Sequence, residues 1–176
     1  MADLTLYHAS PSRSSIVLWM LEELGLPYDI ELIKLSEGDN MKPAYLADEF
    51  PQAKLNIPIG NPRRGVYLKW LFFGPSCIEP AVIDRAAPRK EEARRGMLSY
   101  GDFDTVMNVT AKAVEQGPWI MGEQFTAADV IVGSNIRWAT MFKLIPERPE
   151  FSAYAARIAA RPAAQRAGAK DKELSA

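Results

Sequence analysis

Residues 4–35 have the pattern of a strand, a helix and a second strand, and this order constrains the fold more than any other feature of the sequence. Every second residue of 4–7 is a leucine, as in a short strand, and residues 14–24 form an apolar run of helical length. Residues 28–35 then alternate between apolar and charged side chains, as in a second strand. Because a crossover helix between sequential strands favours parallel pairing, a ligand is expected beyond the carboxyl end of the first strand.

A hydroxyl-rich turn with Ser10, Ser12 and Ser14 occupies that place. The first backbone N–H groups of a helix have no partner within the helix and lie at the positive end of its dipole. A serine there can donate its O–H toward a thiolate, a carboxylate or a phosphate. The alternative is that one serine only caps the helix, which is the commoner use of serine before a helix. The turn by itself leaves both interpretations open.

The charge balance and the rare residues argue against several functions. With 21 Lys and Arg against 22 Asp and Glu, the chain lacks the basic surface expected for nucleic acid or an anionic membrane. Neither a leader nor an apolar stretch of bilayer length is present, which predicts a cytoplasmic protein with a small ligand. The single histidine, His8, and the single cysteine, Cys77, give no internal disulfide and no metal ligand set. No metal is expected, and Cys77 is predicted to be a buried apolar residue.

Prolines and glycines between residues 48 and 62 predict a connector, and most of the chain beyond them has helical periodicity. We therefore predict an α/β domain at residues 1–54, a linker at 55–62 and an all-helical domain at 63–176. Helices are expected at residues 63–83, 89–116, from 127 onward and at 149–161, with a soluble tail from residue 166. The apolar positions of the second helix are expected to form its buried face: Ala93, Met97, Tyr100, Phe103, Met107 and Val114.

The clearest helix start is the segment Phe125-Thr-Ala-Ala-Asp-Val130. Thr126 is predicted at the N-cap, with Asp129 at the third helical position and Phe125 packed against Val130. This capping box is expected to contribute about 1 kcal/mol, so Asp129 is interpreted as structural and not as catalytic.

Four segments resemble a bacterial cytosolic glutathione transferase. They are the turn at Leu6 to Ser14, the junction at Leu21 to Tyr28, the helix at Tyr67 to Phe73 and the box at Phe125 to Asp129. The resemblance implies an α/β thioredoxin-like N-terminal domain that binds glutathione and an all-α C-terminal helical bundle that holds the electrophile. It also implies a homodimer whose partners are glutathione and a small apolar electrophile.

The resemblance further implies which residues act. A hydroxyl of the turn would hydrogen-bond the glutathione sulfur and lower the pKa of its thiol. Ser12 is the first choice, and Ser14, Ser10 and Tyr7 remain alternatives. Cysteine-type members place a cysteine in this turn, whereas this turn has Arg13 and no thiol, so the chain is interpreted as serine-type. Ser12 and Arg13 are expected to bind glutathione, and the electrophile pocket is expected to include His8, Phe72, Phe73, Tyr100 and Trp138.

The chain departs from the family at one place, where Ala47 meets Asp48 directly. Family members of ordinary length have two further strands and a helix here, about 30 residues by usual element lengths. Either this sequence omits that segment or the protein lacks it. We favour the first interpretation, because a two-strand remnant leaves an unpaired strand edge.

Two functions from different classes follow. The first is an enzyme that adds the glutathione thiolate to a small apolar electrophile. The alternative is a non-catalytic module of the same architecture that binds apolar ligands or other proteins.

Overall fold

The structure is a computed structural model that describes residues 4–8, 13–32, 51–91 and 93–174. The chain divides into two compact units. The first unit combines residues 1–56 with residues 159–176, and the second consists of residues 57–158.

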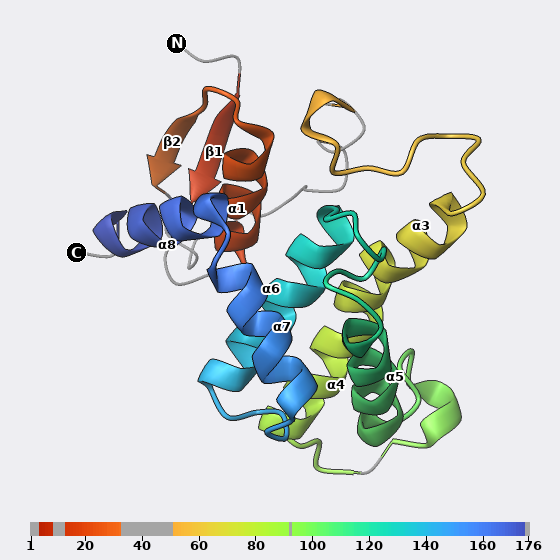
Figure 1. Cartoon of the computed structure of the whole chain (residues 1–176). Helices are drawn as coiled ribbons and strands as arrows, with labels where there is room; N and C mark the ends of the chain where they lie inside the picture. The colour runs from red at the N-terminus through yellow and green to blue at the C-terminus, as the bar shows by residue number, and fades with distance from the viewer. Residues whose placement is uncertain (1–3, 9–12, 33–50, 92, 175–176) are drawn as a thin grey trace. The chain divides into compact units, whose positions relative to one another are not determined.

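The first unit contains the strand–helix–strand order that the sequence predicts. Strand β1 (Thr5–His8) pairs in parallel with β2 (Asp29–Leu32), and α1 (Ser14–Leu24) connects them (Figure 1). The register places Leu6 opposite Ile30, and Leu6 is buried. Helix α1 ends at Gly25, whose φ of 66° is a left-handed conformation that glycine adopts without strain.

The C-terminal helix α8 (Pro162–Leu174) belongs to the first unit and packs along α1 (Figure 1). The prediction of a soluble tail from residue 166 is wrong. The buried face of α8 consists of Ala163, Ala164 and Ala167, which recur at helical spacing. Because alanine adds little hydrophobicity, this face gives a weak amphipathic signal, although it allows two helices to approach closely. A short 3₁₀ turn, η2 (Pro51–Ala53), also lies in this unit.

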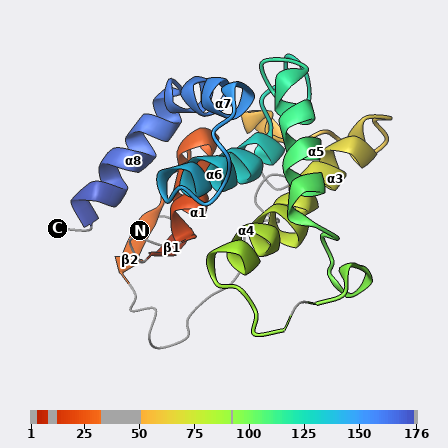
Figure 2. The ribbon, with the colours of Figure 1, turned by 90° about the horizontal axis from the view of Figure 1, so that it is seen from below.

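The second unit is helical, as predicted. Its elements are α3 (Arg64–Phe73), the π-helical turn η3 (Gly74–Ile78), α4 (Glu79–Ala86), the 3₁₀ turn η4 (Arg95–Met97), α5 (Phe103–Glu115), α6 (Ala127–Met141) and α7 (Pro149–Ala159). Helices α6 and α3 are in contact, and Figure 2 shows the helices of this unit from below. Helix α6 contributes several buried residues to this unit, including Val130, Val132 and Ile136. At Gly133 a Cβ atom would lie 2.0 Å from Cδ1 of Ile158, so a larger residue there would force this buried side chain of α7 to shift.

The long helix predicted over residues 89–116 is wrong in its first half. Helix α5 begins at Phe103, because Asp102 is the N-cap and its Oδ1 accepts from the Thr105 N–H at 2.7 Å. Tyr100 and Met97 therefore lie outside the helix, and Met97 is 79% exposed. The second half of the prediction holds, since Met107 and Val114 are buried.

Thr126 and Asp129 form a capping box at the start of α6. The Asp129 carboxylate accepts from the Thr126 N–H and from the Ile120 N–H, both at 2.8 Å, and from the Tyr154 O–H at 2.7 Å. Burial raises the pKa of Asp129, although these hydrogen bonds oppose the shift. The carboxylate thus joins α6, α7 and the chain before α6 in the core of the second unit.

Within the described parts of the chain, no helix is both long and apolar enough to cross a membrane.

Candidate functional site

The candidate site lies where β1 ends and α1 begins. The described residues at this place are His8, the last residue of β1, Arg13, the N-cap of α1, and Ser14, the first helical residue. Arg13 is exposed. The predicted site residues Ser10 and Ser12 lie outside the described residues, and so does the side chain of Tyr7.

His8 is completely buried, and both nitrogens of its ring have partners. The Ser14 Oγ lies 2.8 Å from Nδ1, and Oδ1 of Asp171 on α8 lies 2.9 Å from Nε2. An ionised carboxylate only accepts hydrogen bonds, so the Nε2–H donates to Asp171. In the neutral ring Nδ1 then holds a lone pair and accepts from the Ser14 O–H. The three side chains form a chain of hydrogen bonds from α8 through β1 to α1.

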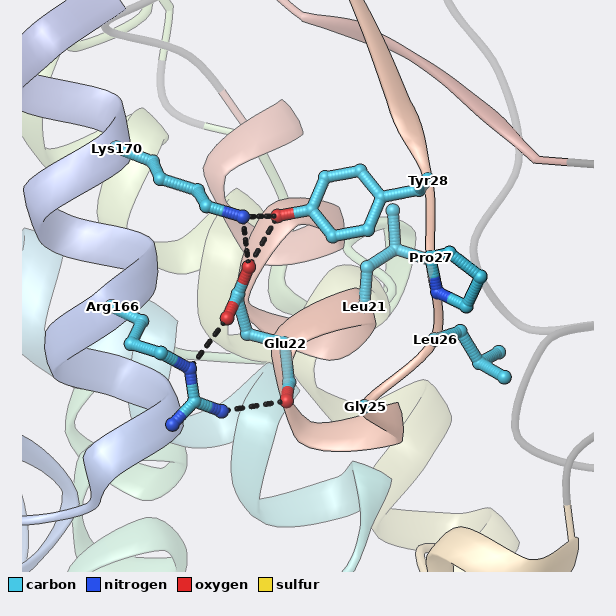
Figure 3. A pocket seen from close by; sticks show the side chains of 8 residues that line it. All are labelled: Leu21, Glu22, Gly25, Leu26, Pro27, Tyr28, Arg166 and Lys170. Carbon is cyan, nitrogen blue, oxygen red and sulfur yellow. Dashed lines mark hydrogen bonds and ion pairs between the residues drawn. The ribbon is translucent and has the colours of Figure 1, made fainter. Parts of the chain in front are cut away.

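A pocket of about 340 Å³ lies on the same unit at the end of α1 (Figure 3). Its lining residues are Leu21, Glu22, Gly25, Leu26, Pro27, Tyr28, Arg166 and Lys170. At its polar side the buried Glu22 carboxylate accepts from the Lys170 Nζ at 2.5 Å, from the Tyr28 O–H at 2.5 Å and from the Arg166 Nε at 2.7 Å. The pocket therefore combines an apolar wall from the α1–β2 connection with a hydrogen-bonded cluster of charges.

The cluster sets the protonation of Glu22. Burial alone raises the pKa of this carboxyl, but the hydrogen bonds from Lys170, Tyr28 and Arg166 outweigh it and lower the pKa to about 2. Burial and the Glu22 carboxylate raise the pKa of Tyr28. Glu22 is therefore ionised at neutral pH and fixes two cations of α8 against α1.

A second attachment of α8 involves the neighbouring acid. Arg161 donates to Oε1 of Glu23 at 2.6 Å through Nε and also to Oε2. The Trp19 indole N–H donates to the same Oε1 at 2.9 Å. Glu23 of α1 is thus paired with Arg161, which directly precedes α8, whereas Glu22 is paired with Arg166 and Lys170 within α8.

The side chains expected in the electrophile pocket have separate neighbours in the second unit. The Phe73 ring packs edge-on against Trp70 with centroids 5.1 Å apart, and the Trp138 ring lies 4.7 Å from that of Phe142. Tyr100 donates its O–H to Asp84 at 2.7 Å. Phe72 and Trp138 are 57% and 50% exposed. His8, expected in the same pocket, is buried in the first unit, so the composition of that pocket stays a prediction.

Cys77 is half-buried on the π-helical turn η3 of the second unit, with Sγ 4.0 Å from the Ser99 carbonyl oxygen. Burial raises the pKa of its thiol, which disfavours a reactive thiolate. No group of three or more His, Cys, Asp or Glu side chains suited to a metal ion occurs among the described residues.

Asp171, Arg166 and Lys170 are not predicted from the sequence. All three lie in the segment interpreted as a tail, which the structure shows as α8. The spacing of Arg166 and Lys170, four residues apart, places them on one face of a helix and was the available signal.

Comparisons with known proteins identify a family. Residues 70–162 match the family described as glutathione S-transferase, C-terminal domain. Glutathione S-transferase GstA of Escherichia coli O157:H7 is 27% identical over 122 residues, which cover 69% of this chain and 60% of that protein. The chain thus spans less than two thirds of the length of this curated relative.

Solved structures show the same architecture. A glutathione transferase from Methylococcus capsulatus strain Bath has a TM-score of 0.80 at 24% identity, covering 96% of this chain and 98% of that one. A sphingomonad glutathione S-transferase complexed with glutathione has a TM-score of 0.76 at 18% identity, covering 96% and 99%. At these identities the likeness concerns the fold.

Proposed function

The chain belongs to the glutathione S-transferase family, and we propose that it transfers the glutathione thiolate to small apolar electrophiles. It also has the fold of glutathione transferases, as the resemblance of its motifs implies. The observation that carries the proposal is the position of Ser14, whose hydroxyl stands at the first residue of α1, beside the carboxyl end of β1. A strand–helix junction of this kind suits an anion, here the sulfur of glutathione.

In the proposed mechanism a hydroxyl of the turn stabilises the thiolate over the thiol, so the nucleophile is present at neutral pH. Ser12, Ser14, Ser10 and Tyr7 are the candidates, and Ser12 and Arg13 hold the tripeptide. The sphingomonad protein, whose structure contains glutathione, supports glutathione as the co-substrate. The electrophile binds against Phe72, Phe73, Tyr100 and Trp138 of the second unit. The enzyme works in the cytoplasm as a homodimer and without a metal.

Retention on immobilised glutathione and turnover of a generic aryl halide test this function. The pKa of the bound glutathione thiol, followed by thiolate absorbance against pH, is expected to fall by about one to two units. Ser12→Ala and Ser14→Ala are compared with Ser152→Ala, which removes an exposed hydroxyl of α7. Replacement of the serine that contacts the sulfur is expected to lower kcat/KM roughly 10- to 100-fold, while the control variant stays near wild type.

A protein that is folded but neither retained nor active would contradict the enzyme and favour the non-catalytic binding module. The segment expected between Ala47 and Asp48 lies outside the described residues. The intact mass of the protein from its natural source tests for it, because a further segment adds about 30 residues to the 176 of this sequence.

A further inference from the structure

The chain of hydrogen bonds from Ser14 through His8 to Asp171 has a chemical capacity that a single serine lacks. A serine hydroxyl alone stabilises a thiolate but does not take up the proton that the thiol loses. A neutral imidazole whose Nδ1 accepts from that serine offers a place for the proton. A carboxylate at the opposite nitrogen stabilises the imidazolium that forms and holds the ring in the required tautomer. All three parts are present within one unit at 2.8 Å and 2.9 Å.

We propose that Ser14, His8 and Asp171 form a proton relay that accepts the thiol proton of bound glutathione. This inference rests on the proposed transferase function and deepens it. The S–H bond breaks as its proton passes to Oγ of Ser14, while the Ser14 hydroxyl proton passes to Nδ1 of His8. The products are a thiolate, an unchanged serine hydroxyl and an imidazolium paired with the Asp171 carboxylate. No proton is gained or lost by the complex.

The relay gives α8 a role in chemistry. Asp171 is a positioning residue, because it touches His8 and not the sulfur. The helix that carries it is fixed to α1 through Glu22, which binds Lys170, the neighbour of Asp171. His8 is completely buried, so bulk water does not compete for its two hydrogen bonds. The first helix of the unit and its last helix therefore place the two ends of the relay.

A purely structural role for His8 is the competing explanation, since a buried histidine with two partners is simply a satisfied polar side chain. The two explanations differ in one observable. A relay predicts that His8 gains a proton when glutathione with its thiol binds, whereas a structural histidine keeps its protonation state.

Because His8 is the only histidine of the chain, nitrogen NMR reports its tautomer and charge without overlap. The experiment uses the full chain. The pH is one at which nitrogen NMR of the protein without ligand shows His8 to be neutral. Glutathione is expected to convert His8 to the imidazolium. S-methylglutathione, which has no thiol proton, is expected to bind and leave the ring neutral with the proton on Nε2.

Three variants test the path. Ser14→Ala is expected to leave His8 neutral with glutathione bound. Asp171→Asn keeps the size of the side chain but removes its charge, so it should lower kcat/KM at neutral pH about tenfold and shift the pH profile upward. His8→Gln keeps hydrogen-bonding groups but takes no proton and should lower kcat/KM roughly 100-fold. Glu173→Gln, on an exposed position of α8, is the matched control and is expected to equal wild type.

The outcomes separate the relay from the transferase function. If glutathione binds and reacts while His8 stays neutral and Asp171→Asn keeps the wild-type pH profile, the relay is wrong and the transferase stands. If glutathione does not bind, both fall. Should His8→Gln fail to fold, the NMR comparison of the two ligands and the near-isosteric Asp171→Asn decide the question.

Discussion

Each of the two units buries a carboxylate, and the two acids are satisfied in opposite ways. Asp129 of the second unit takes its hydrogen bonds from uncharged groups, two of them within nine residues along the chain. Glu22 of the first unit is held by Arg166 and Lys170, which lie 144 and 148 residues away. Burial accordingly raises the pKa of Asp129, whereas the cations and Tyr28 lower that of Glu22 to about 2. The buried acid of the second unit thus depends largely on residues near it in sequence, whereas that of the first unit depends on residues far from it in sequence.

The largest expected effect comes from Asp129→Ala. The substitution leaves four donors without their acceptor in the core, namely the N–H and O–H of Thr126, the Ile120 N–H and the Tyr154 O–H. We expect the free energy of unfolding to fall by about 3–4 kcal/mol. Hydrogen exchange is the measurement, because it reads α6 and α7 separately from α1 and α8. Asp104→Asn, an exposed acid of α5, is expected to change it by less than about 0.5 kcal/mol, and a similar small change for Asp129→Ala would break the comparison.

Glu22→Gln is expected to cost about 2 kcal/mol at neutral pH, because two charge-assisted hydrogen bonds lose their carboxylate. The loss should appear as weaker exchange protection in both α1 and α8, because Glu22 of α1 binds two cations of α8 that lie 144 and 148 residues away. Glu31→Gln, at an exposed position of β2, serves as the control. Loss confined to α1 would mean that α8 is held by its alanine face and not by Glu22.

The two acids are expected to respond to acid with opposite sign. Since the folded pKa of Glu22 lies below its ordinary value of 4.5, its contribution is present above about pH 4.5 and is lost as the pH falls through about 2. The raised pKa of Asp129 acts the other way, because its protonated form is favoured by folding and this contribution is lost as the pH rises.

Denaturation over this acidic range measures both contributions. As the pH falls, Glu22→Gln should flatten the loss of stability and Asp129→Asn should steepen it. Equal slopes for both variants and the wild type would contradict the assignment of opposite shifts.

The smallest effect on stability is expected from a substitution at Gly25. This residue ends α1 through its own backbone conformation, whereas the ion pairs of Glu22 in the first unit join residues far apart in sequence. With φ at 66°, Gly25→Ala strains the end of α1 by about 1 kcal/mol, although the added Cβ meets no atom of another segment within 4 Å. Thermal denaturation of this variant beside Gly168→Ala, at a helical glycine of α8, checks the sign. The control should be neutral or stabilising, because alanine is the better helix former.

The same contrast explains what the sequence predicts. The strand–helix–strand order, the end of α1 at Gly25 and the start of α6 at Thr126 each depend on residues within one turn of each other, and local patterns indicate them. The predicted helix across Tyr100 is wrong for a local reason, because Gly101 with φ 77° and the Asp102 cap outweigh the apolar spacing.

Only part of the candidate site can be predicted from the sequence. Ser14 is indicated by its place at the start of an apolar helix, and the choice among the serines stays a prediction. Asp171 is 163 residues from His8, and no periodicity along the chain joins them. Its helix is marked by alanines, whose burial depends on the partner helix and not on their own hydrophobicity.

The attachment of α8 to α1 also orders events during synthesis. Arg161 is translated 138 residues after Glu23, which takes on the order of ten seconds on a ribosome. Throughout that interval the cationic partners of Glu22 and Glu23 in α1 are not yet synthesised, while all of residues 57–158 emerge and can fold. The first unit is thus begun before the second and completed after it, and it is the one that chaperones are expected to hold.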